Sequence, residues 1–158
     1  MTNSTSRHAS GDWTSWPWLS DEHRELVTKL DDWIAVQAEQ HADAPGGTGQ
    51  PARLLYQALA ADDWFARAAI SETPRRSGLT NACLIRDCLA YSSGMADVSF
   101  SEPWLASLPL QLAGSDTTRP YLRRHLAGTC LLAFALSEPG AGSDAAAMTT
   151  TATRDGNH

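Results

Sequence analysis

The sequence predicts a mainly α-helical protein in which about five helices are followed by the first strands of a β-domain. Apolar residues recur at helical spacing as far as residue 128, where a short apolar run begins and ends in a turn rich in glycine and serine. The 158 residues are 42% hydrophobic, which is sufficient for one core. We therefore expect a disordered or extended arm over 1–19, a helical domain over 20–128 and the start of a β-domain over 129–158.

The first two helices follow from their start signals and apolar stripes. Ser20 is a suitable N-cap ahead of two acidic residues, and the apolar residues after it predict a helix that runs to about residue 40. The glycines and the proline of 43–50 predict a loop. A proline then suits the first turn of a second helix over 51–61, and Trp64 is expected to close this helix pair.

Two further helices are expected after the polar loop at 73–78. The two arginines of this loop are interpreted as solvated, and a contact with a nucleotide phosphate or an acidic partner is the alternative. Thr80 can cap a helix that passes a weak point at Gly94. Ser101 is expected to begin the next helix, because Pro103 suits a first turn.

The last helix is predicted to begin at Ser115 or Asp116. It ends at Gly128, in the usual C-terminal glycine pattern. His125 lies near that end, where a cation interacts favourably with the helix dipole, and we interpret it as a structural residue of this kind.

Three tryptophans lie close together near the beginning of the sequence. They are Trp13, Trp16 and Trp18, on either side of Pro17. Because these side chains are large and apolar, we expect them to cover another part of the protein.

Composition excludes several classes of function. A net charge of −6 and a pI near 5.2 argue against nucleic-acid binding. The three cysteines lack C-x-x-C spacing, so we expect small core residues rather than disulfides or a metal site. Residues 1–10 lack the pattern of a signal peptide, and no segment is long and apolar enough for membrane insertion. The cytoplasm is therefore the expected location.

Residues 135–147 form the most informative segment. The apolar run 129–136 predicts a buried strand, and Ser137 offers a hydroxyl at its end. A Pro-Gly pair then turns the chain, and the small residues 141–143 leave backbone amides uncovered. Such amides can receive a ring edge or a phosphate oxygen. The Gly-Ser pair alone would indicate an ordinary turn, whereas the whole run favours a binding loop.

This loop resembles the signature of the acyl-CoA dehydrogenase family. The signature contains a small residue, an aliphatic residue, Ser or Thr, and Glu, and then a small residue, Gly, Ser or Thr, and Asp; all are matched from Ala135 to Ala147. The segments 109–128 and 147–156 are similar to the family's approach to the loop and to its following strand. The resemblance implies that the β-domain is the beginning of an incomplete β-barrel that binds FAD.

The resemblance also implies roles for individual residues. Ser137 matches the Ser or Thr whose hydroxyl bonds near flavin N5, the atom that receives hydride. In the family, the helix corresponding to the one that starts at Thr80 runs along the acyl cavity, and a carboxylate at Asp97 would favour a short or polar acyl group. The candidate cofactor-binding residues are Phe134, Ala135, Leu136, Ser137, Gly142 and Ser143, and the candidate substrate residues are Ser143, Asp97, Val98 and Ser101.

The family's catalytic glutamate is expected outside this sequence. Residues 148–154 alternate as a strand, and Asp155-Gly156 predicts a hairpin turn without a return strand after it. In the family, a Trp-containing strand, the rest of the barrel and a C-terminal helical domain follow, and that domain holds the base and much of the nucleotide site. The base removes the α-proton of an acyl thioester while the β-hydride passes to FAD. We therefore expect no catalytic residue in this chain.

Two functions are consistent with these features. The first is a component of an FAD-dependent acyl-CoA dehydrogenase-type oxidoreductase, one half of a split enzyme that needs a second protein chain, or self-association, to complete the site. The second is a non-catalytic truncated remnant or a helical interaction module without flavin chemistry. The acyl group, its carrier (coenzyme A or a carrier protein), the electron acceptor and the distinction between dehydrogenase, oxidase and monooxygenase stay open.

Overall fold

The computed structural model describes residues 15–41, 49–70 and 75–156. Most of the predicted loop at 43–50, the first two residues of the loop at 73–78 and Trp13 lie outside this part of the chain. Within it the protein is mainly α-helical, as predicted, with no strand and six α-helices: α1 (Asp21–His41), α2 (Gly49–Ala61), α3 (Trp64–Arg67), α4 (Arg75–Ser92), α5 (Gly94–Ala113) and α6 (Arg119–Leu126).

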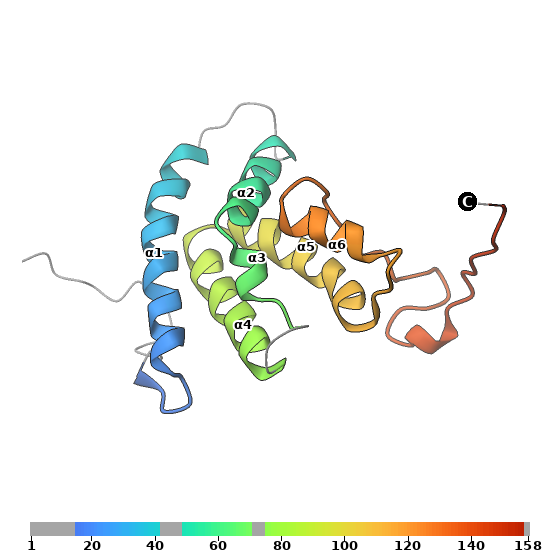
Figure 1. Cartoon of the computed structure of the whole chain (residues 1–158), viewed down its shortest axis with the longest axis horizontal. Coiled ribbons are helices and arrows are strands. Elements are labelled where there is room, and N and C mark those ends of the chain that lie inside the picture. Colours follow the sequence, from blue (N-terminus) through green and yellow to red (C-terminus); the bar gives the residue numbers. More distant parts are fainter. Residues whose placement is uncertain (1–14, 42–48, 71–74, 157–158) are drawn as a thin grey trace, which may run out of the picture.

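The helices pack around α4 and α5. Helix α1 lies against α4 and α2, and α5 contacts α2, α4 and α6 (Figure 1). The apolar stripe predicted for the first helix is confirmed, because Leu26, Val27, Leu30 and Ile34 are all buried. The centre of the core consists of side chains from five helices, namely Leu30, Leu59, Phe65, Ile85, Leu89 and Phe100.

The boundary between α4 and α5 differs from the prediction. The chain breaks at Ser93, which is extended and whose Oγ accepts a hydrogen bond from the amide of Ala96, so α5 begins at the glycine that was predicted to weaken a continuous helix. Pro103 lies inside α5 rather than at the start of a new helix. An interior proline costs about 3 kcal/mol, and the burial of Phe100 and Trp104 on either side of it offsets that cost.

The end of α6 agrees with the sequence pattern, whereas its beginning does not. Gly128 has a φ of +70°, as expected for a glycine that ends a helix. The helix starts at Arg119 because Ser115 and Thr118 form a turn, in which the Ser115 amide donates to Thr118 Oγ1.

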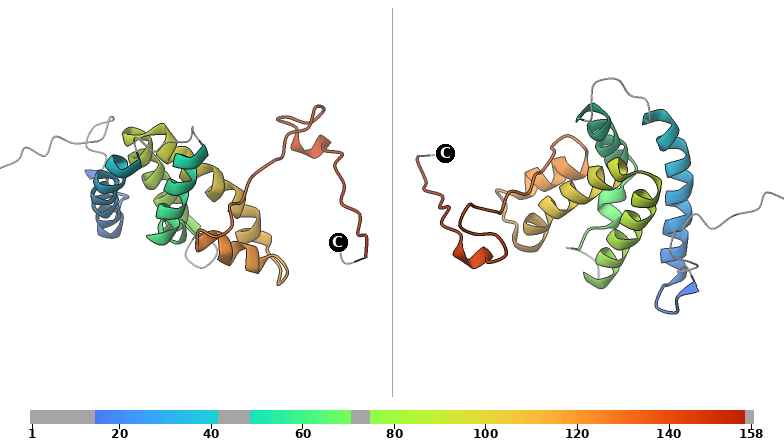
Figure 2. Two further views of the ribbon diagram at one scale, coloured as in Figure 1. Left: turned by 90° about the horizontal axis from the view of Figure 1, so that it is seen from above. Right: turned by 180° about the vertical axis from the view of Figure 1, so that it is seen from behind.

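The predicted strands are absent from the described part of the chain. Residues 129–136 run in extended form without a ladder partner, and the one isolated bridge joins Glu138 and Ala141. The segment leaves the helices and passes through a 3-10 turn, η2 (Ala145–Ala147), before residues 148–156 (Figures 1 and 2). A strand is defined by ladder hydrogen bonds to a neighbouring strand, and no described segment forms such a ladder with residues 129–136. The expected burial is therefore also wrong, since Leu131 is 60% exposed and Phe134 is 42% exposed.

Two further expectations are only partly met. Cys88 is a core residue, whereas Cys130 is half-buried and Cys83 is exposed. Trp16 and Trp18 are exposed rather than covering the core. No helix in the described ranges has the length and apolar character needed to cross a membrane.

Candidate functional site

Tyr56 of α2 binds the chain at residues 125 and 130, where the segment that leads to the loop at 135–147 leaves the helical bundle. Its Oη lies 2.8 Å from the carbonyl oxygen of Cys130, 2.9 Å from the carbonyl oxygen of His125 and 3.2 Å from His125 Nδ1. The hydroxyl has one proton, so it donates to a carbonyl and accepts from the imidazole. Burial raises the pKa of Tyr56 to about 12, which keeps this donor protonated. The segment therefore departs from a defined point at the end of α6.

His125 is a neutral core residue. It is fully buried, the edge of its ring meets Phe65 with 4.8 Å between the ring centroids, and burial lowers its pKa to about 4. Its Nε2 has no hydrogen-bond partner among the described residues. That environment favours the tautomer with the proton on Nδ1, which donates to Tyr56. The interpretation of His125 as a cation at the helix end is wrong, because the ring faces the core.

The loop itself begins with a tight turn. The amide of Glu138 donates to the carbonyl of Ala141 at 3.0 Å, and the amide of Ala141 donates back to Glu138 at 3.1 Å. Pro139 and Gly140 form the tip between these two residues, as their turn propensities predict. Ala141 is buried, so the turn packs on its own chain.

Glu138 also connects the two ends of the loop. Its Oε2 accepts hydrogen bonds from the amide and the hydroxyl of Thr149, at 2.9 and 3.0 Å, and its Oε1 accepts one from the amide of Thr150 at 2.8 Å. These donors lower the pKa of Glu138 to about 2, so the carboxylate is ionised at neutral pH. We call this contact the Glu138 clasp.

The loop leaves several hydrogen-bond donors available. The hydroxyls of Ser137 and Ser143 and the amides of Gly142 and Ser143 bond to no residue that the structure describes. Both serines are exposed. A Cβ built on Gly142 would meet no atom within 4 Å, so the chain has room for a larger residue there. These donors lie close together in sequence and can receive an anion or a ring edge.

Alanine substitutions should distinguish Gly128, whose backbone conformation requires glycine, from Gly142, where the structure has room for a side chain. Gly128→Ala forces a positive φ on a residue with a side chain and brings its Cβ to 3.0 Å from Ala60 Cβ, so we expect a loss of about 1–2 kcal/mol of stability. Gly142→Ala meets open space and should change stability by less than about 0.5 kcal/mol. Urea denaturation of both variants measures the difference. Equal losses of stability in the two variants would show that the fold itself requires glycine at 142. They would contradict the interpretation that a ligand requires it.

A cavity of about 640 Å³ lies between α2, α5 and residues 128–134. Val98 of α5 and Phe134 both line it, so the structure brings together one predicted substrate residue and one predicted cofactor residue. Most other lining residues are small or apolar. Its charged groups come from Arg53 and Glu102, and Gln57, Ser99 and Thr129 add uncharged polar groups. An apolar cavity with a few polar groups is typical of a site for a small organic ligand.

The two other predicted substrate residues of α5 lie outside this cavity. Both carboxylate oxygens of Asp97 are bound by the Arg86 guanidinium, with distances of 2.9 and 3.0 Å, and the pair spans the break between α4 and α5. Ser101 is buried and does not line the cavity. The carboxylate at 97 therefore has a local structural partner, and it is not a polar group of the cavity wall.

The structure separates the loop donors from the cavity. None of residues 135–143 lines it, and the loop extends away from the helices (Figure 2). Sequence analysis missed Arg53 and Glu102 as lining residues. The described residues contain no cluster of His, Cys, Asp and Glu that could hold a metal ion.

Known proteins resemble this chain over part of their length. The chain matches no protein-family model. It is similar to a 3-(aryl)acrylate reductase from Clostridium sporogenes, with 32% identity over 145 residues that cover 87% of this chain and 37% of the relative. It is also similar to the caffeyl-CoA reductase-Etf complex subunit CarC from Acetobacterium woodii, with 48% identity over 71 residues that cover 44% of this chain and 19% of that subunit.

These matches identify the chain as homologous to part of the acyl-CoA dehydrogenase-like reductases. The resemblance predicted from residues 135–147 is thereby confirmed. The matches span 37% and 19% of the two relatives, so each relative contains extensive regions that they do not cover.

Proposed function

We propose that this chain forms part of the FAD- and acyl-thioester-binding site of an acyl-CoA dehydrogenase-type oxidoreductase. The observation that carries the proposal is the loop at 137–143. It has the family's residue types, and its two serine hydroxyls and two amides are unpaired among the described residues. The fold does not require glycine at 142, because a side chain there would meet no other atom of the protein. A ligand that approaches the backbone closely would require it.

The candidate residues fit a flavin in chemical terms. Ser137 and the amides of Gly142 and Ser143 are neutral donors, which suit the electron-rich ring edge and the phosphates of FAD. Phe134, Ala135 and Leu136 precede them and are exposed, so they can cover a flat ring. When bound, FAD supplies the hydride acceptor or donor at the α,β-carbons of the acyl group. The relatives are named as reductases, which supports reduction as well as dehydrogenation.

The cavity between α2 and α5 is proposed to receive the acyl part of the thioester. Val98 offers an apolar wall that is 51% exposed, and Phe134 connects the cavity to the loop segment. Arg53 and Glu102 can orient a polar substituent, because they are the charged residues that line it. Ser143 stays a candidate contact for the carrier side of the ligand.

A complete enzyme needs regions beyond those described here. The catalytic base and the remaining flavin contacts would come from a second chain or from a longer polypeptide that includes this sequence. The name of the Acetobacterium relative places it in a complex, which supports a partner chain. The exposed Leu131, Leu136 and Met148 give such a partner an apolar surface to cover.

Flavin retention tests this proposal. The chain alone should purify without visible flavin absorbance, because it offers only one side of the site. Co-expression with a polypeptide homologous to the rest of the Clostridium relative should give a complex with one FAD per chain. The variant Gly142→Leu should assemble equally well and lose the flavin, since its side chain occupies the space that we assign to the ligand.

Two outcomes would contradict the proposal. A yellow chain that binds FAD alone with micromolar affinity would show that the site is complete without other regions. A complex that forms but retains no flavin would favour the helical interaction module instead.

A further inference from the structure

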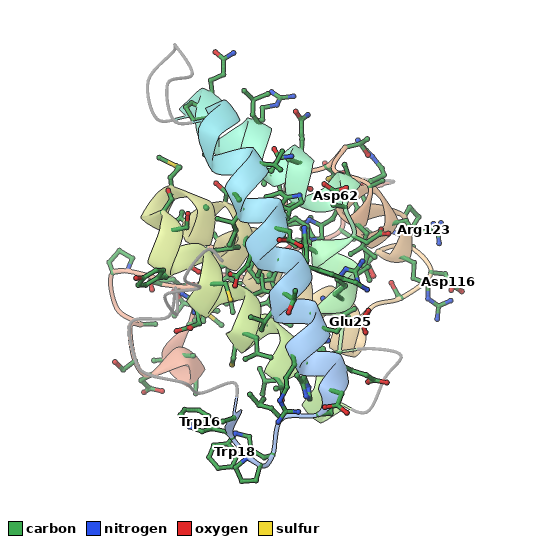
Figure 3. All side chains as sticks on the ribbon, turned by 90° about the vertical axis from the view of Figure 1, so that its left-hand side faces the viewer. Trp16, Trp18, Glu25, Asp62, Asp116 and Arg123 are labelled. Carbon is green, nitrogen blue, oxygen red and sulfur yellow. The ribbon has the colours of Figure 1, made fainter. Side chains whose placement is uncertain are left out.

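Trp16 and Trp18 form an exposed aromatic pair in the segment just before α1. Their ring centroids lie 4.9 Å apart at an interplanar angle of 42°, and the two residues are 46% and 68% exposed (Figure 3). Two large aromatic side chains held together in solvent contribute little to the core. Their surface is therefore available for a ligand.

A pocket of about 270 Å³ lies between this pair and helix α4. Leu19 contributes to it, and the α4 side is formed by Thr80, Cys83, Leu84 and Asp87. These four residues have the spacing of one helix face. The pocket thus has aromatic rings on one side and a helix face with a carboxylate on the other.

Within the described ranges, the Asp87 carboxylate has no partner of opposite charge. It is exposed and makes no ion pair with any residue of the described ranges. The neighbouring Arg86 binds Asp97, and Arg24, which donates to the Trp16 carbonyl, is paired with Asp21. The whole chain has a net charge of −6, which favours the approach of a cationic partner.

We propose that the Trp16–Trp18–Asp87 pocket binds an arginine side chain of a partner protein. A guanidinium is planar, stacks on indole rings and pairs with a carboxylate through several donors, so one group satisfies all three residues. The volume of about 270 Å³ accommodates the guanidinium group together with part of its aliphatic stem. This interaction goes beyond the proposed flavin site, and the two can fail independently.

The test uses the full chain and the tripeptide acetyl-Gly-Arg-Gly-amide as the probe. Titration is followed by NMR through the indole N–H signals, with those of Trp16 and Trp18 assigned by substitution. We expect saturable shifts of these two signals, with a dissociation constant on the order of 1–10 mM, because the contact is exposed. Acetyl-Gly-Lys-Gly-amide should bind more weakly, and acetyl-Gly-Ala-Gly-amide should cause no saturable shift.

Three variants locate the interaction. Asp87→Asn removes only the charge and should weaken arginine-peptide binding about fivefold or more. Trp18→Leu keeps an apolar side chain but removes the ring, and should weaken it similarly. Asp32→Asn, at an exposed acidic position on α1 outside the pocket, is the control and should bind as the wild type does. Circular dichroism checks that each variant keeps its helices.

The proposal is overturned if the arginine peptide shifts the two indole signals no more than the alanine peptide does. Wild-type affinity in Asp87→Asn or Trp18→Leu would overturn it too. Tighter binding of tetramethylammonium than of the arginine peptide would assign the pocket to a small quaternary ammonium ligand instead.

Discussion

Replacement of Ser137 by alanine is expected to slow turnover of the complete enzyme by roughly one to two orders of magnitude, as for the loss of a hydrogen-bond donor that acts in the transition state. The resemblance assigns its hydroxyl to the flavin near N5. In this chain the hydroxyl is exposed and bonds to no described residue, so its loss should leave folding nearly unchanged. Stopped-flow flavin absorbance at saturating substrate measures the rate.

Ser93→Ala is the matched control for this substitution. Ser93 caps α5 through the Ala96 amide, so its loss should cost about 1 kcal/mol of stability and leave the rate of flavin reduction unchanged. If Ser137→Ala instead lowers thermal stability while flavin reduction keeps its rate, Ser137 is a structural residue.

Acidification is expected to destabilise the helical bundle through His125. Its folded-state pKa of about 4 lies below the ordinary value of 6.5. Between these two pH values the unfolded chain therefore binds a proton that the folded protein does not. The stability that neutral His125 contributes is complete above pH 6.5, declines as the pH falls, and reaches its lower limit below pH 4. The loss amounts to about 2 kcal/mol between pH 7 and pH 4.5 and to about 3 kcal/mol in full. Urea denaturation at several pH values measures it.

Removal of the imidazole should flatten this dependence. His125→Phe keeps an aromatic ring beside Phe65, and His125→Gln keeps a polar side chain, so either variant can report if the other does not fold. An unchanged slope in both His125 variants would show that the titrating group lies elsewhere.

The helical part was largely predictable because its signals are local. Ser20 and the stripe through Leu30 define α1, and Gly128 ends the helical region as its left-handed conformation requires. The helix start assigned to Pro103 was wrong because local propensity disfavours an interior proline, whereas tertiary packing of α5 tolerates it. His125 was misassigned for the same reason, since a sequence does not show which face of α6 meets the core.

In the C-terminal segment the turn was predictable from the sequence, whereas the pairing of its strands was not. The turn at Pro139 depends on neighbouring residues and forms as predicted. A strand over 129–136 depends on a second strand, which the described chain does not provide. The cavity beside Val98 likewise depends on how α2, α5 and this segment come together. The roles proposed for Ser137, Gly142 and Ser143, and the division of the chain at 128/129, stay predictions.

The Glu138 clasp has a consequence for the energetics of ligand binding. Because the carboxylate holds Thr149 and Thr150 from within the same chain, the intervening residues lose conformational freedom when the protein folds. A ligand that enters this loop then meets donors that are already ordered, so less of its interaction free energy is consumed by entropy loss in the protein. Association should accordingly resemble docking to a preformed surface, with a rate governed by encounter rather than by loop closure.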